Sequence, residues 1–228
     1  MISVCMPTYN GEKYIREQLD SILSQLEEYD EVIISDDSST DNTIEIIKSY
    51  KDSRIHLYPE NHFQSPIFNM ENALKNANGE FIFMSDQDDV WVDNKVTVMM
   101  RYLEQYDCVV SDAMIVDSDL NEIAPSYFEI CKCKTGIIRN IVKNGYIGCC
   151  MAFRQTLLGK VLPFPQSIPM HDMWIGINAE RYGRSIFINE KLIKYRRHEN
   201  NASATSEKSN NSLVTKMKYR LDIIRALL

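Results

Sequence analysis

No stretch of this 228-residue sequence approaches the ~18 to 20 apolar residues that a helix needs to cross a bilayer. Met1 runs directly into an apolar segment, without the basic region or the cleavage site of a secretory signal. We therefore expect a protein of the cytoplasm that does not span a membrane, although it can still lie peripherally on the inner face of the cell membrane.

Disulfide and zinc patterns are also missing. The cysteines are scattered and form no even framework: Cys5, Cys108, Cys131, Cys133, Cys149 and Cys150. Neither Cys131-Lys132-Cys133 nor Cys149-Cys150 belongs to the two well-separated pairs of a zinc site. In a reducing compartment these residues are most simply structural thiols, and metal or redox work is the less favoured alternative.

Positive charge and glycine-rich loops are scarce. The formal net charge is -7, which opposes binding to a phosphate backbone, so we expect no nucleic acid partner. Residues 7–11, after the first apolar run, contain no glycine-rich phosphate loop, and Gly-x-Gly-x-x-Gly occurs nowhere. Hydrophobic residues make up 44% of the chain, enough for one substantial core.

Apolar patterns in the first half predict alternating strands and helices. Short apolar runs predict buried strands at residues 2–6, 32–34, 55–58 and 81–84. Apolar residues at helical spacing predict the helices between them, at residues 15–26, 41–50 and 69–77. Strands separated by such helices indicate βαβ units and a mainly parallel sheet, with functional residues at the carboxyl ends of the strands.

The second half is less regular. We expect a strand at 109–116, a short helix at 137–142, mixed turn and strand signals over 145–153, and a helix from 171 to about 182. Two apolar runs, 186–188 and 192–195, predict a closing hairpin. The fold class expected is therefore α/β, with a central sheet flanked by helices and a smaller mixed region.

The tail, after a polar segment at 200–212, carries an apolar stripe at helical spacing: Val214, Met217, Leu221, Ile224 and Leu228. Basic residues lie around this stripe: Lys216, Lys218, Arg220 and Arg225. One interpretation is a helix docked on the protein's own core. The alternative is an interfacial helix that gives peripheral membrane contact through its attraction to anionic lipid.

Three carboxylates, Asp86, Asp88 and Asp89, follow the fourth predicted strand in the segment Ser-Asp-Gln-Asp-Asp-Val-Trp. Carboxylates this close together at the end of a buried strand repel one another unless a cation relieves them. A hard divalent cation takes oxygen ligands and keeps positions open for substrate phosphates. The segment predicts a site for a phosphorylated donor. The alternative is a solvated acidic loop, with Asp93 or Asn94 capping the next helix.

Polar motifs follow the first two strands as well. Tyr9, in Pro7-Thr8-Tyr9-Asn10, can stack on a base, and the pair Asp36-Asp37 can accept hydrogen bonds from a base or a ribose. Each motif is equally typical of a plain turn.

Two motifs of the second half allow two interpretations each. Asp172, in His171-Asp172, is either a helix cap or a general base that deprotonates an acceptor hydroxyl. The run Tyr195-Arg196-Arg197-His198 can supply cations for a diphosphate and an imidazole for a metal, or it is an exposed basic run.

Taken in this order, the motifs closely resemble those of the family 2 glycosyltransferases, over residues 1 to about 200. The Asp-Gln-Asp-Asp-x-Trp variant is similar to the rhamnosyltransferase-like bacterial branch. The resemblance implies the GT-A fold, a Rossmann-like domain fused to an acceptor region. Residues 1–106 would form the nucleotide-sugar-binding half and 107–200 the acceptor half, followed by a linker and an amphipathic helix at 201–228.

The resemblance also implies roles for individual residues. The nucleotide would be held by Pro7, Thr8, Tyr9, Asp37, Asp86 and Arg197. Asp88 and His198 would ligate Mg²⁺ or Mn²⁺, and Asp172 would be the catalytic base. The sugar or acceptor pocket would be lined by Asp89, Trp91, Gly148, Cys149 and His171.

The implied activity is an inverting, metal-dependent transfer from a UDP- or dTDP-sugar to a hydroxyl of a glycan or lipid-linked acceptor, in cell-surface polysaccharide synthesis. Processive synthases of the family carry Gln-x-x-Arg-Trp, whereas Arg196-Arg197-His198 has no following tryptophan, so we expect non-processive transfer. The alternatives are a nucleotidyltransferase acting on a sugar phosphate, which should carry a glycine-rich phosphate loop, and a non-catalytic module that binds metal or nucleotide.

Overall fold

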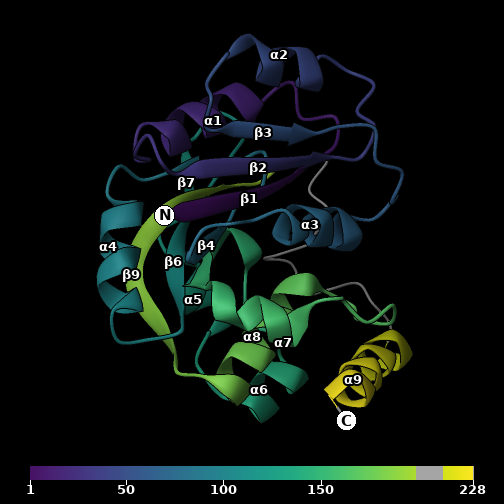
Figure 1. Ribbon diagram of the computed structural model, residues 1–228. Coiled ribbons are helices and arrows are strands. Elements are labelled where there is room, and N and C mark those ends of the chain that lie inside the picture. Colours follow the sequence, from purple (N-terminus) through teal and green to yellow (C-terminus); the bar gives the residue numbers. More distant parts are fainter. Residues whose placement is uncertain (199–212, 228) are drawn as a thin grey trace.

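Residues 1–198 and 213–227, which the computed structural model describes, form a nine-stranded sheet with helices packed against it (Figure 1). Four parallel strands, in the order β3-β2-β1-β4, make up one half of the sheet. Their bounds are Ile2–Thr8 for β1, Glu31–Asp36 for β2, Ile55–Tyr58 for β3 and Phe81–Met84 for β4. All four strands were expected from their apolar runs, because a strand covered on both faces carries apolar residues without alternation.

The other half of the sheet is mixed. Strand β8 (Met151–Arg154) runs antiparallel to β4 and to β6 (Cys108–Val116). The order continues to β9 (Ser185–Arg196) and to β5 (Val90–Trp91), and β7 (Glu122–Ala124) pairs with β6 off this path. The predicted α/β class with a mixed second region is therefore confirmed.

The predicted closing hairpin is wrong. Residues 186–188 and 192–195 belong to one strand, β9, which runs parallel to β6 along most of its length. The register shifts between Ser111 and Asp112, where two additional residues of β9, Asn189 and Glu190, have no partner in β6. Such a bulge bends the strand but does not reverse the chain as a hairpin would. In the sequence, its two polar residues resemble a turn.

Helices cover both halves of the sheet. Their bounds are Ile15–Leu23 (α1), Thr43–Ser49 (α2), Pro66–Lys75 (α3), Lys95–Leu103 (α4), Tyr127–Cys131 (α5), Ile137–Val142 (α6), Leu158–Val161 (α7), His171–Tyr182 (α8) and Leu213–Leu227 (α9). Short 3-10 turns cover Gly148–Cys150 and Gln155–Leu157. Ile15, Leu19 and Ile22 lie on one side of α1 and are fully buried, as the helical spacing predicted.

The tail helix α9 only partly matches its prediction. It buries Ile223 completely, whereas the stripe residues Val214, Met217, Leu221 and Ile224 are exposed. The expected polar segment 200–212 and Leu228 lie outside the described residues. Among the described helices, none combines the length and the apolar character that a membrane span requires.

All six cysteines are free thiols, and five of them are buried. This arrangement favours the interpretation as structural thiols.

Candidate active site

The carboxyl ends of β1, β2 and β4 meet at one edge of the sheet, as expected for adjacent parallel strands. Thr8 at the end of β1 pairs in register with Asp36 at the end of β2, and its hydroxyl donates to Asp36 Oδ2 at 2.7 Å. The acidic loop, residues 85–89, follows β4 at the same edge.

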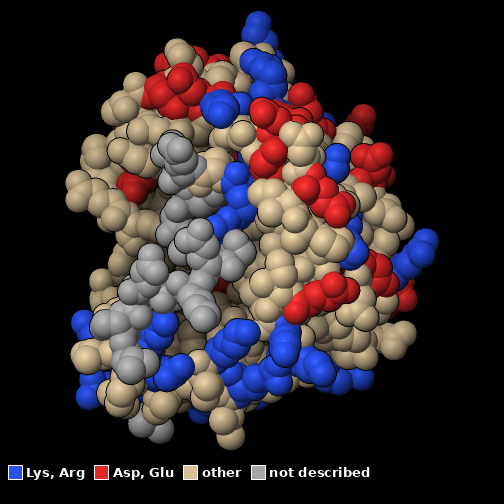
Figure 2. All heavy atoms as spheres, turned by 180° about the vertical axis from the view of Figure 1, so that it is seen from behind, with Lys and Arg blue, Asp and Glu red and all other residues tan. Residues whose placement is uncertain are grey.

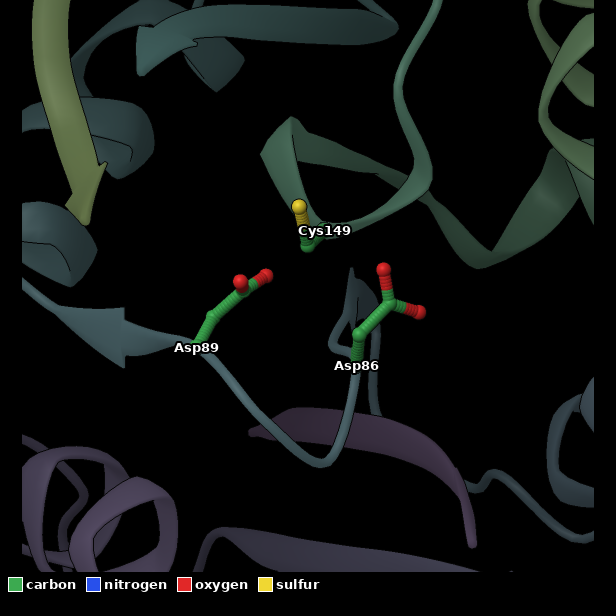
Figure 3. A group of neighbouring side chains, drawn as sticks. All are labelled: Asp86, Asp89 and Cys149. Atoms are coloured by element: carbon green, nitrogen blue, oxygen red, sulfur yellow. The ribbon is translucent and has the colours of Figure 1, made fainter. Parts of the chain in front are cut away.

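Side chains from distant parts of the chain converge on the acidic loop. Asp86, Asp89 and Cys149 place one potential ligand atom each within 4.8 Å of the others. Figure 3 shows the two carboxylates projecting from the two ends of the loop into the space beside Cys149. Cys149 belongs to the Gly148–Cys150 turn, 60 residues further along the chain than Asp89.

The third carboxylate of the loop, Asp88, contacts His198, which follows strand β9. Its Oδ2 lies 2.8 Å from His198 Nε2. The imidazole ring packs on Tyr14, with ring centroids 4.9 Å apart. The structure therefore brings together the two residues, Asp88 and His198, that were expected to share a metal ion.

Asp172 lies at the start of α8, where its carboxylate accepts a hydrogen bond from the Met173 N–H at 2.6 Å. The Gly148–Cys150 turn passes close by. A Cβ at Gly148 would lie 3.3 Å from His171 Nε2 and 3.9 Å from Asp172 Cβ. A side chain at position 148 would crowd the His171 imidazole, so the glycine lets the turn approach the start of α8.

Burial and like charge raise the pKa values of these carboxyl groups. The pKa of Asp86 is raised to about 7, mainly by burial and then by the charges of Asp88 and Asp172. Burial also raises the pKa of Asp172 to about 7. The pKa of Asp89 is raised well above its usual range by burial and by its acidic neighbours. Without a positive ion, the cluster resists full ionisation.

The donors present fit a hard divalent cation. Asp89 Oδ2 is buried and has no hydrogen-bond partner among the described residues, and an orphaned acceptor of this kind calls for an ion or a water. Carboxylate oxygens suit Mg²⁺ or Mn²⁺, and a neutral imidazole is a common metal ligand in general. The pKa of the Cys149 thiol is raised, first by its hydrogen bond with Cys150 and then by burial, and a soft sulfur ligand suits Mg²⁺ or Mn²⁺ less well than carboxylate oxygens do.

Arg196 belongs to the run that was interpreted either as cations for a diphosphate or as an exposed basic run, and it is part of the scaffold instead. It is 2% exposed, and its guanidinium donates to the carbonyls of Asp88 and Ser118 and to the Glu17 carboxylate. Its own N–H donates to Asp89 Oδ1 at 2.9 Å. Arg197, the expected nucleotide ligand, donates its N–H to the Val116 carbonyl at 2.8 Å.

At the expected base site, two loops are joined by Gln87. Its amide Oε1 accepts from the Tyr9 N–H and its Nε2 donates to the Tyr9 carbonyl, each at 2.9 Å. A Cβ at Gly11 would lie 2.5 Å from Gln87 Oε1, so only glycine permits this contact. The Tyr9 ring is 56% exposed and free to meet a ligand.

Asp37 is held by the loop that precedes α3. Its two carboxylate oxygens accept the N–H groups of Phe63, at 2.6 Å, and Ser65, at 3.2 Å. Each oxygen retains a further lone pair for a base N–H. Pro7 and Thr8 lie at the end of β1 beside this loop edge, and Thr8 is fully buried.

Two residues expected in the sugar or acceptor pocket, Asp89 and Trp91, lie at the end of the acidic loop and in β5, which follows it. Trp91 is 2% exposed and packs on Phe83, and the Lys95 ammonium lies 4.9 Å from its ring centroid. Lys95 is itself fully buried and donates to the Cys149 carbonyl at 2.9 Å. The indole therefore packs beneath the acidic loop, and a place for Trp91 in the sugar or acceptor pocket stays a prediction. Asp89 has no exposed surface, and its carboxylate faces Asp86 and Cys149.

Sequence reasoning missed Gln87, Lys95 and the scaffold role of Arg196. Gln18 was missed too: its Nε2 donates to Ser85 Oγ and to the Asp86 carbonyl, at 2.7 and 2.8 Å. The one available signal was the position of Gln87 inside the acidic motif. The contacts of the others join residues that are 54 to 179 positions apart, so no local pattern marks them.

Comparison with known families decides the assignment. The model of "Glycosyl transferase family 2" matches residues 3–162. The chain belongs to glycosyltransferase family 2. This match spans the acidic loop and the Gly148–Cys150 turn. The resemblance predicted from the motifs is therefore confirmed.

Two curated relatives illustrate the range of the family. The chain is 30% identical over 241 residues to the dTDP-rhamnosyl transferase RfbG of Shigella flexneri, covering 96% of this chain and 79% of that protein. It is 34% identical over 103 residues to the UDP-Glc:alpha-D-GlcNAc-diphosphoundecaprenol beta-1,3-glucosyltransferase WfgD of Escherichia coli. That alignment covers 45% of this chain and 41% of WfgD, less than half of the relative's length.

Solved structures share the fold. S. aureus TarS 1-349 in complex with UDP-GlcNAc superposes with a TM-score of 0.76 at 23% identity, covering all of this chain and 67% of that one. The mannosyltransferase PcManGT from Pyrobaculum calidifontis, in complex with GDP-Man and Mn2+, gives a TM-score of 0.63 at 18% identity, covering 99% of this chain and 62% of that one. The expected GT-A fold is thereby confirmed.

Proposed function

We propose that this protein transfers one sugar at a time, with inversion, from a UDP- or dTDP-sugar to a hydroxyl of a glycan or lipid-linked acceptor. The reaction would take place in the cytoplasm, during the synthesis of a cell-surface polysaccharide. The observation that carries the proposal is the convergence of Asp86, Asp89 and Asp172 around the Gly148–Cys150 turn, with the charge of Asp88 close enough to act on Asp86. This arrangement would put the nucleotide-sugar site, at the sheet edge, next to a carboxylate that is suited to proton abstraction.

Asp172 would act as the general base. Its pKa of about 7 lies near the usual working pH, where a base combines sufficient ionisation with proton affinity. It would take the proton of the acceptor hydroxyl, whose oxygen then attacks the anomeric carbon as the bond to the nucleotide diphosphate breaks. A single displacement from the face opposite the leaving group inverts that carbon.

Asp88 and His198 would hold Mg²⁺ or Mn²⁺, with Asp86 alongside. Bound there, the ion would supply Lewis-acid stabilisation for the charge that develops on the departing diphosphate. The complex of PcManGT with GDP-Man and Mn2+ supports this role for a protein of the same fold. Tyr9 and Asp37 would recognise the pyrimidine through stacking and through a hydrogen bond from its N3–H. Pro7, Thr8 and Arg197 remain candidates for the same nucleotide, and His171, Gly148 and Cys149 for the sugar or acceptor.

The division of labour between the halves is also a proposal. Residues 1–106 would bind the nucleotide-sugar and 107–200 the acceptor, with the boundary between α4, which ends at Leu103, and β6, which begins at Cys108. The family match disfavours a nucleotidyltransferase. The raised pKa of Asp172, beside the acidic loop, favours an enzyme over a non-catalytic binding module, because perturbed pKa values cluster at catalytic sites.

The test compares Asp172→Asn and Asp88→Asn with the unchanged protein. We expect Asp172→Asn to lower the rate of sugar transfer, measured as release of nucleotide diphosphate from the nucleotide-sugar, by ~10²- to 10⁴-fold. Binding of the nucleotide should be retained. Asp88→Asn should abolish the increase in UDP or dTDP affinity that Mn²⁺ produces in calorimetry. The matched control is Asp93→Asn, an exposed carboxylate just beyond the loop. If all three variants retain the rate of the unchanged protein, Asp172 is not the base and the proposal is wrong.

A further inference from the structure

The two halves of the chain carry opposite net charge. Residues 1–106 contain 8 Lys and Arg against 20 Asp and Glu, a net charge of -12. Residues 107–228 contain 17 against 12, a net charge of +5. Asymmetry of this size in an acidic protein indicates a region of the surface that meets an anionic partner.

The positive charge is concentrated at one end of the molecule. On the face shown in Figure 2, Lys and Arg form a band along the lower edge, where Figure 1 places α6 and α9, and Asp and Glu predominate toward the opposite end. The basic residues of the α5–α6 segment are all exposed: Lys132, Lys134, Arg139 and Lys143.

Helix α9 exposes apolar residues at this end. Ile223 is fully buried, Arg220 donates to the Val142 carbonyl of α6 at 2.8 Å, and Arg181 of α8 donates to the Leu227 carbonyl. These contacts fix the orientation of the helix. The outward stripe is then exposed by 77%, 60%, 49% and 41% at Val214, Met217, Leu221 and Ile224, respectively.

Helix α6 continues the apolar surface. Ile138 and Val142 are 80% and 57% exposed. They line a depression of about 360 Å³ together with the side chains of Lys132, Arg139 and Lys143. Apolar side chains thus alternate with cationic ones across α6 and α9, which we call the α6–α9 face (residues 130–143 and 214–225).

We propose that the α6–α9 face docks on the surface of an anionic phospholipid bilayer. Exposed apolar residues gathered in one region of a protein surface mark an interaction site. Apolar residues can enter the boundary between headgroups and acyl chains while Lys and Arg attract lipid phosphates, which is how interfacial helices bind. A second copy of this chain is the weaker occupant, because two cationic faces would repel each other. The proposal does not depend on the catalytic roles given above.

The test is sedimentation of the full chain with vesicles of phosphatidylcholine, with and without phosphatidylglycerol. We expect binding only when phosphatidylglycerol is present, and a decrease as salt is raised. Lys132→Glu combined with Lys143→Glu should weaken binding at least ~10-fold, since each cation near an anionic surface contributes to it. The control is Lys48→Glu with Lys51→Glu, two exposed lysines of the first half.

A second pair of variants tests the apolar contribution. Met217→Ser with Leu221→Ser changes only exposed positions and should also lower vesicle binding, whereas Tyr29→Ser, 66% exposed elsewhere, should not. Equal binding to both kinds of vesicle, or binding to neither, overturns the proposal. So does a dimer in sedimentation velocity that Met217→Ser with Leu221→Ser disrupts, because a second copy would then occupy the face. Retained UDP or dTDP binding in the same variants separates this outcome from failure of the proposed transfer activity.

Discussion

At the scale of single residues, the carboxyl groups of the site differ in their surroundings although they share one cluster. Asp172 is 8% exposed and Asp89 is fully buried, whereas Asp88 is partly accessible and has an imidazole partner. In the proposed roles, Asp88, which would help to hold an ion, has the His198 imidazole as a partner. Asp172, which would exchange a proton, is instead enclosed, and burial raises its pKa to about 7.

The pKa of Asp172 predicts the pH dependence of the rate. Only the ionised carboxylate can accept a proton, so kcat/KM should fall about tenfold per pH unit below pH 7 and level off above it. A pH series with saturating Mn²⁺ checks this. A flat profile between pH 5.5 and 7 would exclude a base whose pKa lies near 7.

The residue whose surroundings differ most from the prediction is Arg196. In a sequence, Arg196-Arg197-His198 resembles an exposed basic run. The structure buries Arg196 because carbonyl and carboxylate acceptors surround it on several sides, and all of them come from other parts of the chain. Burial of a charged side chain depends on such tertiary partners, and no local pattern encodes them.

At the scale of the elements, prediction worked best where structure is local. The bounds of β3, β4 and α6 agree with the prediction residue for residue, and α8 begins at the predicted residue and ends close to the predicted one. The error at β9 arose because parallel pairing with β6 is a long-range property: Ile188 pairs with Ser111, 77 positions away. The proximity of the Gly148–Cys150 turn to the acidic loop is also a long-range property, and only the family resemblance, not a local pattern, indicated that Gly148 and Cys149 share a pocket with Asp89.

The link between the β1–α1 loop and the acidic loop can be tested through Gln87. Gln87→Ala removes two hydrogen bonds to Tyr9, both near solvent, so the free energy of unfolding should fall by only ~1 kcal/mol. Nucleotide affinity should fall more, by ~10-fold, because Tyr9 loses its fixed position. Urea unfolding and calorimetry measure the two quantities. Gln105→Ala, an exposed glutamine after α4, is the control, and an unchanged nucleotide affinity in Gln87→Ala would contradict the link.

At the scale of the whole molecule, the acidic cluster should make stability depend on pH in an unusual direction. The folded-state pKa values of Asp86 and Asp172, about 7, lie above the value of a free carboxyl group, near 4. The native state therefore binds protons more tightly than the unfolded state. The contribution of these groups to stability is full below pH ~4 and is lost as pH rises toward 7.

A divalent cation should counteract that loss. We expect the Tm without added metal to fall from pH 5.5 to pH 8, and Mn²⁺ to raise the Tm more at pH 8 than at pH 5.5, because protonated carboxyl groups bind the ion weakly. Thermal unfolding at both pH values measures this. Asp88→Asn should reduce the Mn²⁺ effect and Asp93→Asn should not; an Mn²⁺ effect that is the same at both pH values would argue against a carboxylate site.

The hydrogen bonds of Arg196 connect the last strand of the sheet to Glu17, Asp88, Asp89 and Ser118. A nascent chain that has emerged only as far as α4 already contains the parallel strands β1 to β4, and its acidic loop has Gln18 and Tyr9 as partners but not yet Arg196. The contacts of Arg196 with Asp88 and Asp89 can form only after residue 196 has left the ribosome. Completion of this part of the loop's support is thus deferred until β9 has been synthesised.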